Sequence, residues 1–239
     1  MCIRDSTYTD PKMQLSFARS DAERLGAALR ANAGHYYSHS ETLMLLDGDG
    51  SKDAILSALR QTVSAATADD TIVFSFAGHG AQDQNGRYFV TPADFDATRS
   101  AETGLAWTDV AALLREAKSR VIIVLDACHA GLSGVEGLGT NDDAVSALLS
   151  GAHPPMLVLA ASKGRQFSYE GSKWGGGVFT DALIETIQRN RQSYDLDHNG
   201  VIETSELYYA LKSLVVRETG GEQTPWLVRQ DLLGDFAVF

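Results

Sequence analysis

The segment Thr71–Phe76, TIVFSF, is a continuous apolar run between Asp69-Asp70 and Gly78. Such a run is typical of a strand that is buried on both faces of a parallel sheet. Two further segments have the same character, VIIVL at 121–125 and MLVLA at 156–160. Helical patterns separate these runs, so strands and helices alternate along the chain. The alternation predicts an α/β fold in which a mostly parallel central sheet lies between two layers of helices.

The elements at the two ends of the chain are less sharply marked. Apolar residues at helical spacing predict a first helix at 21–33, and later helices at 179–191 and 205–217. We expect a last strand near Phe236–Phe239. The opening residues Met1–Ser6, MCIRDS, read like a translated sequencing adapter. We therefore expect residues 1–14 to be disordered or artefactual, and residues 15–239 to form one domain.

Composition limits the classes of partner. The 239 residues, 44% apolar and 21% charged, suit one α/β domain with a full core. The formal net charge of −11 repels phosphate backbones and anionic lipid, so we expect neither nucleic acid nor a membrane surface as a partner. No apolar run reaches the roughly 18–20 residues of a membrane span. The acidic balance favours cationic ligands, either basic peptides or metal ions.

Reactive side chains directly follow two of the predicted buried strands. The first strand runs into Ala77-Gly78-His79-Gly80, and the second runs into Asp126-Ala127-Cys128. Loops at the carboxyl ends of parallel strands converge at one edge of the sheet, so we expect the imidazole of His79 and the thiol of Cys128 to meet there. A neighbouring imidazole activates a thiol, and the backbone N–H groups of Gly80 and Cys128 are candidate oxyanion donors. The alternative is that both residues belong to the core.

The two motifs FAGHG and LDACHAG resemble the histidine and cysteine motifs of the caspase-like cysteine peptidases, peptidase family C14. The resemblance covers residues 15 to 235 and implies a caspase-like three-layer α/β/α sandwich whose first strand is missing. It also implies a cysteine endopeptidase that uses His79 and Cys128 as a catalytic dyad. The aspartate two residues before the cysteine is similar to that of metacaspases and their bacterial relatives.

The metacaspase pattern implies the substrate class. Asp126 is expected at the floor of the specificity pocket, where it selects arginine or lysine before the scissile bond. Ser162, in the loop after the third buried strand, is expected to add a polar wall. His129 is adjacent to the nucleophile, but neighbouring residues of an extended segment point in opposite directions, so it is not expected to be the base.

A second motif predicts a calcium site. Residues 195–206, DLDHNGVIETSE, fit the twelve-residue EF-hand loop, and helical patterns flank them. Oxygen ligands in such a loop recur at fixed positions, with a glycine at the sharp turn and a bidentate glutamate at the end. The expected ligands are Asp195, Asp197, Asn199, the carbonyl of Val201, and Glu206, with a water or Glu203 between them. The alternative is an acidic turn that caps a helix.

Two classes of function therefore stay open at this point. The first is a cysteine endopeptidase, possessing a basic-residue pocket and activated or structurally supported by Ca²⁺. The second is a catalytically inactive caspase-like domain that binds calcium or acts as a scaffold. No organic cofactor is expected, because no strand is followed by a dinucleotide-binding glycine motif. The expected partner is a peptide or protein substrate, and the expected state is a monomer.

Overall fold

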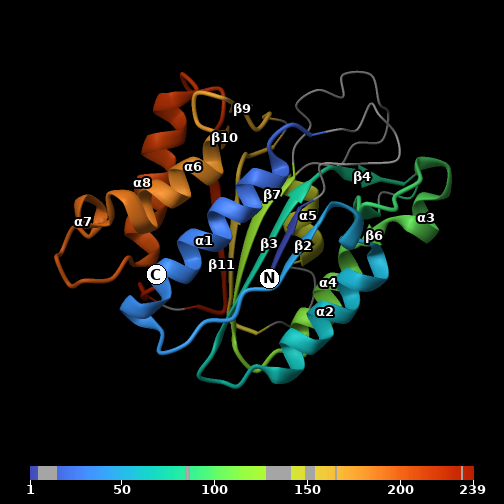
Figure 1. Ribbon diagram of the computed structural model, residues 1–239, viewed down its shortest axis with the longest axis horizontal. Helices are drawn as coiled ribbons and strands as arrows, with labels where there is room; N and C mark the ends of the chain where they lie inside the picture. Colours follow the sequence, from blue (N-terminus) through green and yellow to red (C-terminus); the bar gives the residue numbers. More distant parts are fainter. Residues whose placement is uncertain are drawn as a thin grey trace.

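The computed structural model describes residues 1–4, 15–83, 85, 87–127, 141–148, 154–164, 166–232 and 234–239. In this part of the chain a six-stranded sheet forms the middle layer (Figure 1). In spatial order its strands are β11 (Trp226–Gln230), β8 (Met156–Ala160), β7 (Arg120–Ala127), β3 (Thr71–Gly78), β1 (Cys2–Arg4) and β2 (Met44–Leu46). Every neighbouring pair is parallel except β11 and β8. The predicted mostly parallel sheet is confirmed.

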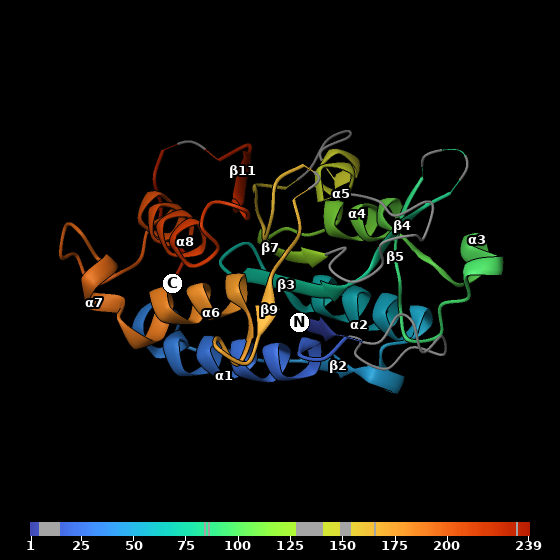
Figure 2. The ribbon, with the colours of Figure 1, turned by 90° about the horizontal axis from the view of Figure 1, so that it is seen from above.

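Helices cover both faces of this sheet, as Figures 1 and 2 show. One face carries α1 (Ala18–Tyr36), α6 (Val178–Ile184) and α8 (Thr204–Glu218), and the other carries α2 (Lys52–Ala65), α4 (Trp107–Arg115) and α5 (Asn141–Leu148). Successive strand residues point to opposite faces. In β7, Ile122 and Val124 therefore join the core under α1, α6 and α8, whereas Ile123 and Leu125 join the other core. The three-layer α/β/α sandwich is confirmed.

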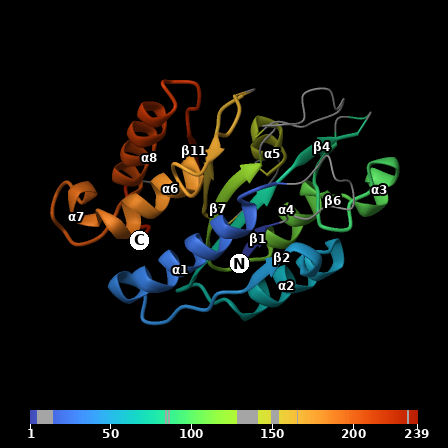
Figure 3. The same cartoon turned by 45° about the horizontal axis from the view of Figure 1, so that its top comes forward.

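Smaller elements surround the carboxyl ends of the central strands. An antiparallel three-stranded sheet lies beside α3 (Figure 3), and a short hairpin lies at the edge where β3 and β7 end (Figure 1). These elements are β4 (Gly80–Gln82), β5 (Tyr88–Val90), β6 (Leu105–Ala106) and α3 (Ser100–Thr103), and then β9 (Glu170–Gly171) with β10 (Gly176–Gly177) in the hairpin. Two 3₁₀ turns span Asp47–Asp49 and Ala97–Arg99, a π-helical turn spans Glu185–Arg189, and α7 spans Arg191–Tyr194.

The expectation of a missing first strand is wrong for this chain. Cys2–Arg4 form β1, which pairs in parallel with both β2 and β3. Cys2 and Ile3 are buried, and Ile3 lies in the core beneath α2. A compact apolar pair fits the space between two parallel strands, because both faces of an interior strand are covered. Residues 5–14 lie outside the described residues, so the expectation of disorder there stays a prediction.

The last strand of the sheet also differs from its expected place. The strand is β11 at 226–230, not Phe236–Phe239. The tail instead makes a single antiparallel bridge between Glu203 and Ala237, and Phe239 is buried. The apolar tail residues are thus used to cover the loop before α8. Among the described residues, no helix has the length and apolarity that crossing a membrane requires.

Candidate active site

The two strands that were expected to deliver the dyad are direct neighbours. β3 and β7 pair in parallel, with Ala77 opposite Asp126 and Gly78 opposite Ala127. His79 directly follows the end of β3. Cys128 directly follows Ala127 in the sequence, but Cys128 and His129 lie outside the described residues. The structure therefore brings the ends of the two motif-bearing strands together at one edge of the sheet.

The backbone around His79 is held by its neighbours in the small antiparallel sheet. The carbonyl oxygen of His79 accepts hydrogen bonds from Thr91 N at 3.0 Å and from Thr91 Oγ1 at 3.1 Å. The next residue, Gly80, begins β4, and a Cβ at Gly80 would lie 2.2 Å from the hydroxyl of Tyr88. Glycine is therefore required at position 80 by close approach. His79 itself is buried, with 2% of its surface exposed.

A pocket opens beside these strand ends. Its wall includes Ala77 and Gly78 at the end of β3, and in the described part of the chain three carboxylates line it. Asp21 comes from α1, Asp126 from β7, and Glu170 from β9. No cationic side chain of the described part is among the lining residues, so the three carboxylates give the pocket a negative charge that attracts cations, which Arg24 beside Asp21 offsets in part. The pocket is small, with a volume of about 40 Å³.

Asp126 is the carboxylate nearest to the sequence motif. It is 9% exposed, and its Oδ1 accepts a hydrogen bond from Ser168 Oγ at 2.9 Å. Ser168 is buried and also lines the pocket. A buried carboxylate requires donors to offset its lost hydration, and Ser168 supplies one of them. Asp126 thus lines a pocket at the strand ends, and its expected role as the floor of a specificity pocket that selects arginine or lysine stays a prediction.

Asp21 is more deeply buried, at 2% exposure, and is tied to two elements. Its Oδ2 accepts a hydrogen bond from Gly177 N at 2.8 Å, and its Oδ1 lies 3.4 Å from Nη1 of Arg24. Arg24 in turn donates from Nη2 to Asp181 Oδ1 at 2.5 Å. These contacts join the start of α1 to the hairpin and to α6, so the Asp21 carboxylate is fixed at the pocket wall.

Glu170 is the most accessible of the three carboxylates. Partial burial, and then the negative charge of Asp126, raise the pKa of the Glu170 carboxyl group above its usual range, although a backbone hydrogen bond from Ser16 opposes the shift. Desolvation and a like charge both disfavour the ionised form. A cation that entered the pocket would oppose this shift, because its positive charge would stabilise the ionised form of Glu170.

A larger groove, of about 710 Å³, lies between α8 and β11. Its described lining includes Lys212, Arg217 and Arg229 but no carboxylate, and His79 lines neither of the two cavities. It also lies away from the ends of β3 and β7. We therefore place the candidate chemistry at the smaller pocket.

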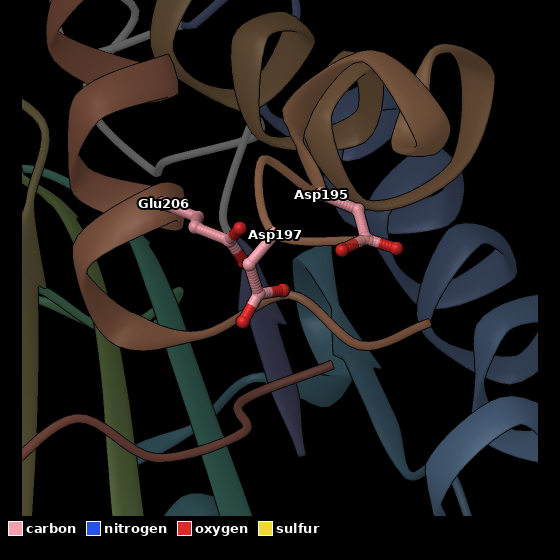
Figure 4. Close-up of side chains that lie close together, drawn as sticks. All are labelled: Asp195, Asp197 and Glu206. Carbon is pink, nitrogen blue, oxygen red and sulfur yellow. The ribbon is translucent and has the colours of Figure 1, made fainter. Parts of the chain in front are cut away.

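The acidic loop predicted to bind calcium connects α7 to α8. Asp195, Asp197 and Glu206 each offer a carboxylate oxygen, and these oxygens lie within 4.8 Å of one another (Figure 4). Gly200 has φ +86°, a left-handed conformation that favours glycine. Asn199 Oδ1 accepts a hydrogen bond from Val201 N at 2.9 Å. The loop thus gathers the predicted carboxylates on one side of a sharp turn.

The surroundings of this loop hold it in place. Ile202 is fully buried, its N–H donates to the carbonyl of Phe239 at 2.7 Å, and its carbonyl accepts from Val238 N at 2.8 Å. Both oxygens of Glu206 accept backbone hydrogen bonds, from Leu196 N at 2.5 Å and Glu203 N at 3.0 Å. The donor set, hard oxygens around a tight turn, is the kind that Ca²⁺ prefers.

Comparison with known proteins settles the family. The sequence profile of the caspase domain, peptidase family C14, matches residues 1–237. The chain belongs to the caspase-domain family. Among solved structures, a protein from Geobacter sulfurreducens matches with a TM-score of 0.65 over 95% of this chain and 91% of its own, at 17% identity. That identity supports the fold alone. None of the curated proteins matches the chain significantly.

Sequence reasoning missed most of the pocket of this caspase domain. Asp21 and Glu170 carry no motif that marks them, and Ser168 lies in a segment that was expected to contribute Ser162 instead. Ser162 is buried and is not among the described residues that line the pocket, so its role in substrate binding stays a prediction. The signal that could have found Asp21 is its place in the first turn of a helix, where a polar side chain points beyond the sheet edge.

Proposed function

We propose that this caspase domain is a cysteine endopeptidase that cleaves after arginine or lysine. The observation that carries the proposal is the convergence of Asp21, Asp126 and Glu170 on one pocket at the ends of β3 and β7. A guanidinium or ammonium group would be attracted by these carboxylates, whereas an aspartate side chain would be repelled. Family membership supports the proposed reaction class, and the charge of the pocket supports the proposed substrate class.

The proposed chemistry uses Cys128 and His79. The imidazole of His79 takes the proton of the Cys128 thiol, and the thiolate attacks the carbonyl carbon of the scissile bond. The C–N bond then breaks, and the amine leaves with the proton held by His79. Water then attacks the resulting thioester and gives a proton to His79. The C–S bond breaks, the carboxyl product leaves, and His79 returns the proton to the sulfur of Cys128. The N–H groups of Gly80 and Cys128 are proposed to stabilise the oxyanion in both steps.

Peptide cleavage tests this proposal. Fluorogenic peptides with arginine, lysine or aspartate before the scissile bond are offered to the full chain, to Cys128→Ala and to Asp126→Asn. We expect cleavage after arginine and lysine, none in Cys128→Ala, and a raised KM in the isosteric Asp126→Asn variant. Cleavage after aspartate would refute the basic pocket. A folded protein that cleaves nothing, and whose Cys128 resists thiol reagents, would favour the inactive scaffold instead.

We further propose that the loop 195–206 binds Ca²⁺. Asp195, Asp197, Asn199, the carbonyl of Val201 and Glu206 would hold the ion, whose charge would offset the crowded carboxylates. The negative charges near this loop already affect Glu203. Burial, and then the charges of Asp235, Asp197 and Glu206, raise the pKa of its carboxyl group. Since α8 begins in this loop and its far end contacts the β9–β10 hairpin, an ion here could support the pocket.

Calorimetry with CaCl₂ alone tests the calcium proposal, with thermal melting in Ca²⁺ and in chelator as a second readout. We expect saturable binding and a higher melting temperature with Ca²⁺. Glu206→Gln should lose both effects. The matched control is Asp49→Asn, in the Asp47–Asp49 turn outside the loop, which should keep them. Absence of heat and of a melting shift in the unmodified chain would reject the site.

A further inference from the structure

Gln223 lies between α8 and β11 and is fully buried, with 0% of its surface exposed. Its carboxamide makes three hydrogen bonds. Oε1 accepts from Tyr169 N at 2.8 Å, while Nε2 donates to the carbonyl of Ala161 at 2.8 Å and to Ser168 Oγ at 3.3 Å. A buried amide with this many partners is costly to replace, since each lost bond leaves a polar group unsatisfied.

The orientation of the carboxamide follows from its partners. Tyr169 N can only donate, so it requires the oxygen of Gln223. The carbonyl of Ala161 can only accept, so it requires the nitrogen. The same nitrogen therefore faces Ser168, and the Ser168 hydroxyl oxygen must accept from it.

Ser168 connects the oriented carboxamide of Gln223 to Asp126 in the pocket. A serine hydroxyl carries a single proton, and here Ser168 Oγ donates to Asp126 Oδ1 at 2.9 Å. With Gln223 donating to a lone pair of the oxygen, the Ser168 proton is directed to Asp126 instead of to another acceptor. The three side chains form one polarised row, from Gln223 through Ser168 to Asp126, and hydrogen bonds in such a row strengthen one another.

We propose that Gln223 is a positioning residue of the specificity pocket, which holds Asp126 through Ser168 in the orientation that binds a cationic side chain. The inference rests on the proposed cleavage after basic residues. Gln223 does not line the pocket itself and acts through Ser168. Its loss should therefore weaken the binding of the basic side chain and leave the chemical step at His79 and Cys128 little changed.

The chain offers a matched control for this role. Gln166 joins the same two segments as Gln223, because its Oε1 accepts from Thr224 N at 2.9 Å and its Nε2 donates to Thr224 Oγ1 at 3.4 Å. None of its hydrogen bonds in the described structure reaches Ser168 or Asp126. Replacing Gln166 by methionine loosens the tie between the segments without breaking the row.

The experiment uses calorimetry to measure the binding of agmatine, which carries a guanidinium group and an ammonium group but no peptide part, to the full chain in a Cys128→Ala background. Gln223→Met and Ser168→Ala should each weaken binding by about tenfold, the value of one hydrogen bond to a charged group. The double variant should be no weaker than the worse single variant, because both changes break the same row. Gln166→Met should bind as the parent does. In chains that keep Cys128, Gln223→Met should raise KM for arginine peptides with kcat within about twofold.

Melting temperatures of all variants show which are folded, and Gln223→Asn, whose amide is one methylene shorter and does not reach Ser168, replaces Gln223→Met if the latter does not fold. Unchanged agmatine affinity in the Gln223 variant overturns the proposal. So does a double variant whose loss equals the product of the two single losses. If the parent binds no agmatine and cleaves after aspartate, the proposed specificity itself fails. If the parent binds agmatine and the Gln223 variant binds it equally well, only the role of Gln223 fails.

Discussion

Asp21 Oδ2 and Asp126 Oδ2 both approach Gly177, although the two carboxylates come from different layers of the fold. A Cβ placed on Gly177 would lie 3.1 Å from the first oxygen and 3.3 Å from the second. The N–H of Gly177 also donates to Asp21 Oδ2 at 2.8 Å. The absence of a side chain at this one position therefore lets the hairpin backbone lie against both carboxylates and leaves the space between them open.

Gly177→Ala should raise KM for arginine peptides. The added methyl group would press on Asp21 and Asp126 and occupy space beside them, and one methyl group in a binding pocket changes affinity by roughly ten- to two-hundred-fold. Steady-state kinetics on arginine peptides measures the change. Gly171→Ala in the same hairpin is the control, because its Cβ would lie 3.5 Å from the Trp174 ring, an ordinary contact. Equal KM values in the two variants would show that the space at Gly177 is not used.

Glu170→Gln should flatten the acid side of the pH profile of kcat/KM. Burial and the charge of Asp126 raise the pKa of Glu170, so this carboxylate is lost as pH falls through that raised value, and cation binding weakens with it. Glutamine does not titrate, so the variant should be less active at neutral pH but lose less of its activity on acidification. Profiles of both proteins with an arginine peptide measure this. The exposed Glu116→Gln variant should keep the parent profile, and an unshifted acid limb in Glu170→Gln would count against the pocket role.

Glu218→Gln should destabilise the fold at neutral pH but not at strongly acidic pH. Hydrogen bonds from Lys173 and Trp174 lower the pKa of Glu218 to about 2. The unfolded value is about 4.3. A depressed pKa contributes stability that is present above the unfolded value and is lost as pH falls toward the folded one. Because the Lys173–Glu218 ion pair is partly exposed, we expect the substitution to lower the free energy of unfolding at neutral pH by at most about 1 kcal/mol. Urea unfolding between pH 2.5 and 7 checks this, and a difference that stayed constant with pH would contradict it.

The predictable part of this protein is the part that hydrophobic runs describe. The strands β3, β7 and β8 are buried on both faces, so each appears as an uninterrupted apolar run, and the residues just after such runs must lie at the sheet edge. That is why His79 and Asp126 could be placed. β1 has only three residues, too few for a pattern, and β11 is an edge strand that carries Arg229 and Gln230, so its run is broken.

The pocket could not be predicted in the same way. Asp21 and Glu170 are far apart in the sequence and meet only because α1 packs against the β9–β10 hairpin. Periodicity indicates which faces are apolar, but it carries no information on which polar residues of different faces will meet. Gln223 was harder still to predict, because a buried glutamine in a polar segment belongs to no hydrophobic or motif pattern in the sequence. Only the three hydrogen-bond partners of its carboxamide show its role.

Thr91→Val should lower kcat while leaving KM for arginine peptides nearly unchanged. The Thr91 hydroxyl and N–H both donate to the carbonyl oxygen of His79, and valine would keep the backbone bond but lose the hydroxyl bond. The carbonyl would lose one donor, and the His79 backbone would be held less firmly at the strand end. A neutral hydrogen bond is worth about 1 kcal/mol, so we expect a loss of roughly fivefold in kcat. Thr91→Ser keeps the hydroxyl and should restore kcat. Catalysis depends on the placement of the imidazole within a fraction of an ångström, so a loosened His79 backbone should affect kcat. An equal loss of kcat in the serine variant, or a change in KM alone, would show that Thr91 supports the fold and not the position of His79.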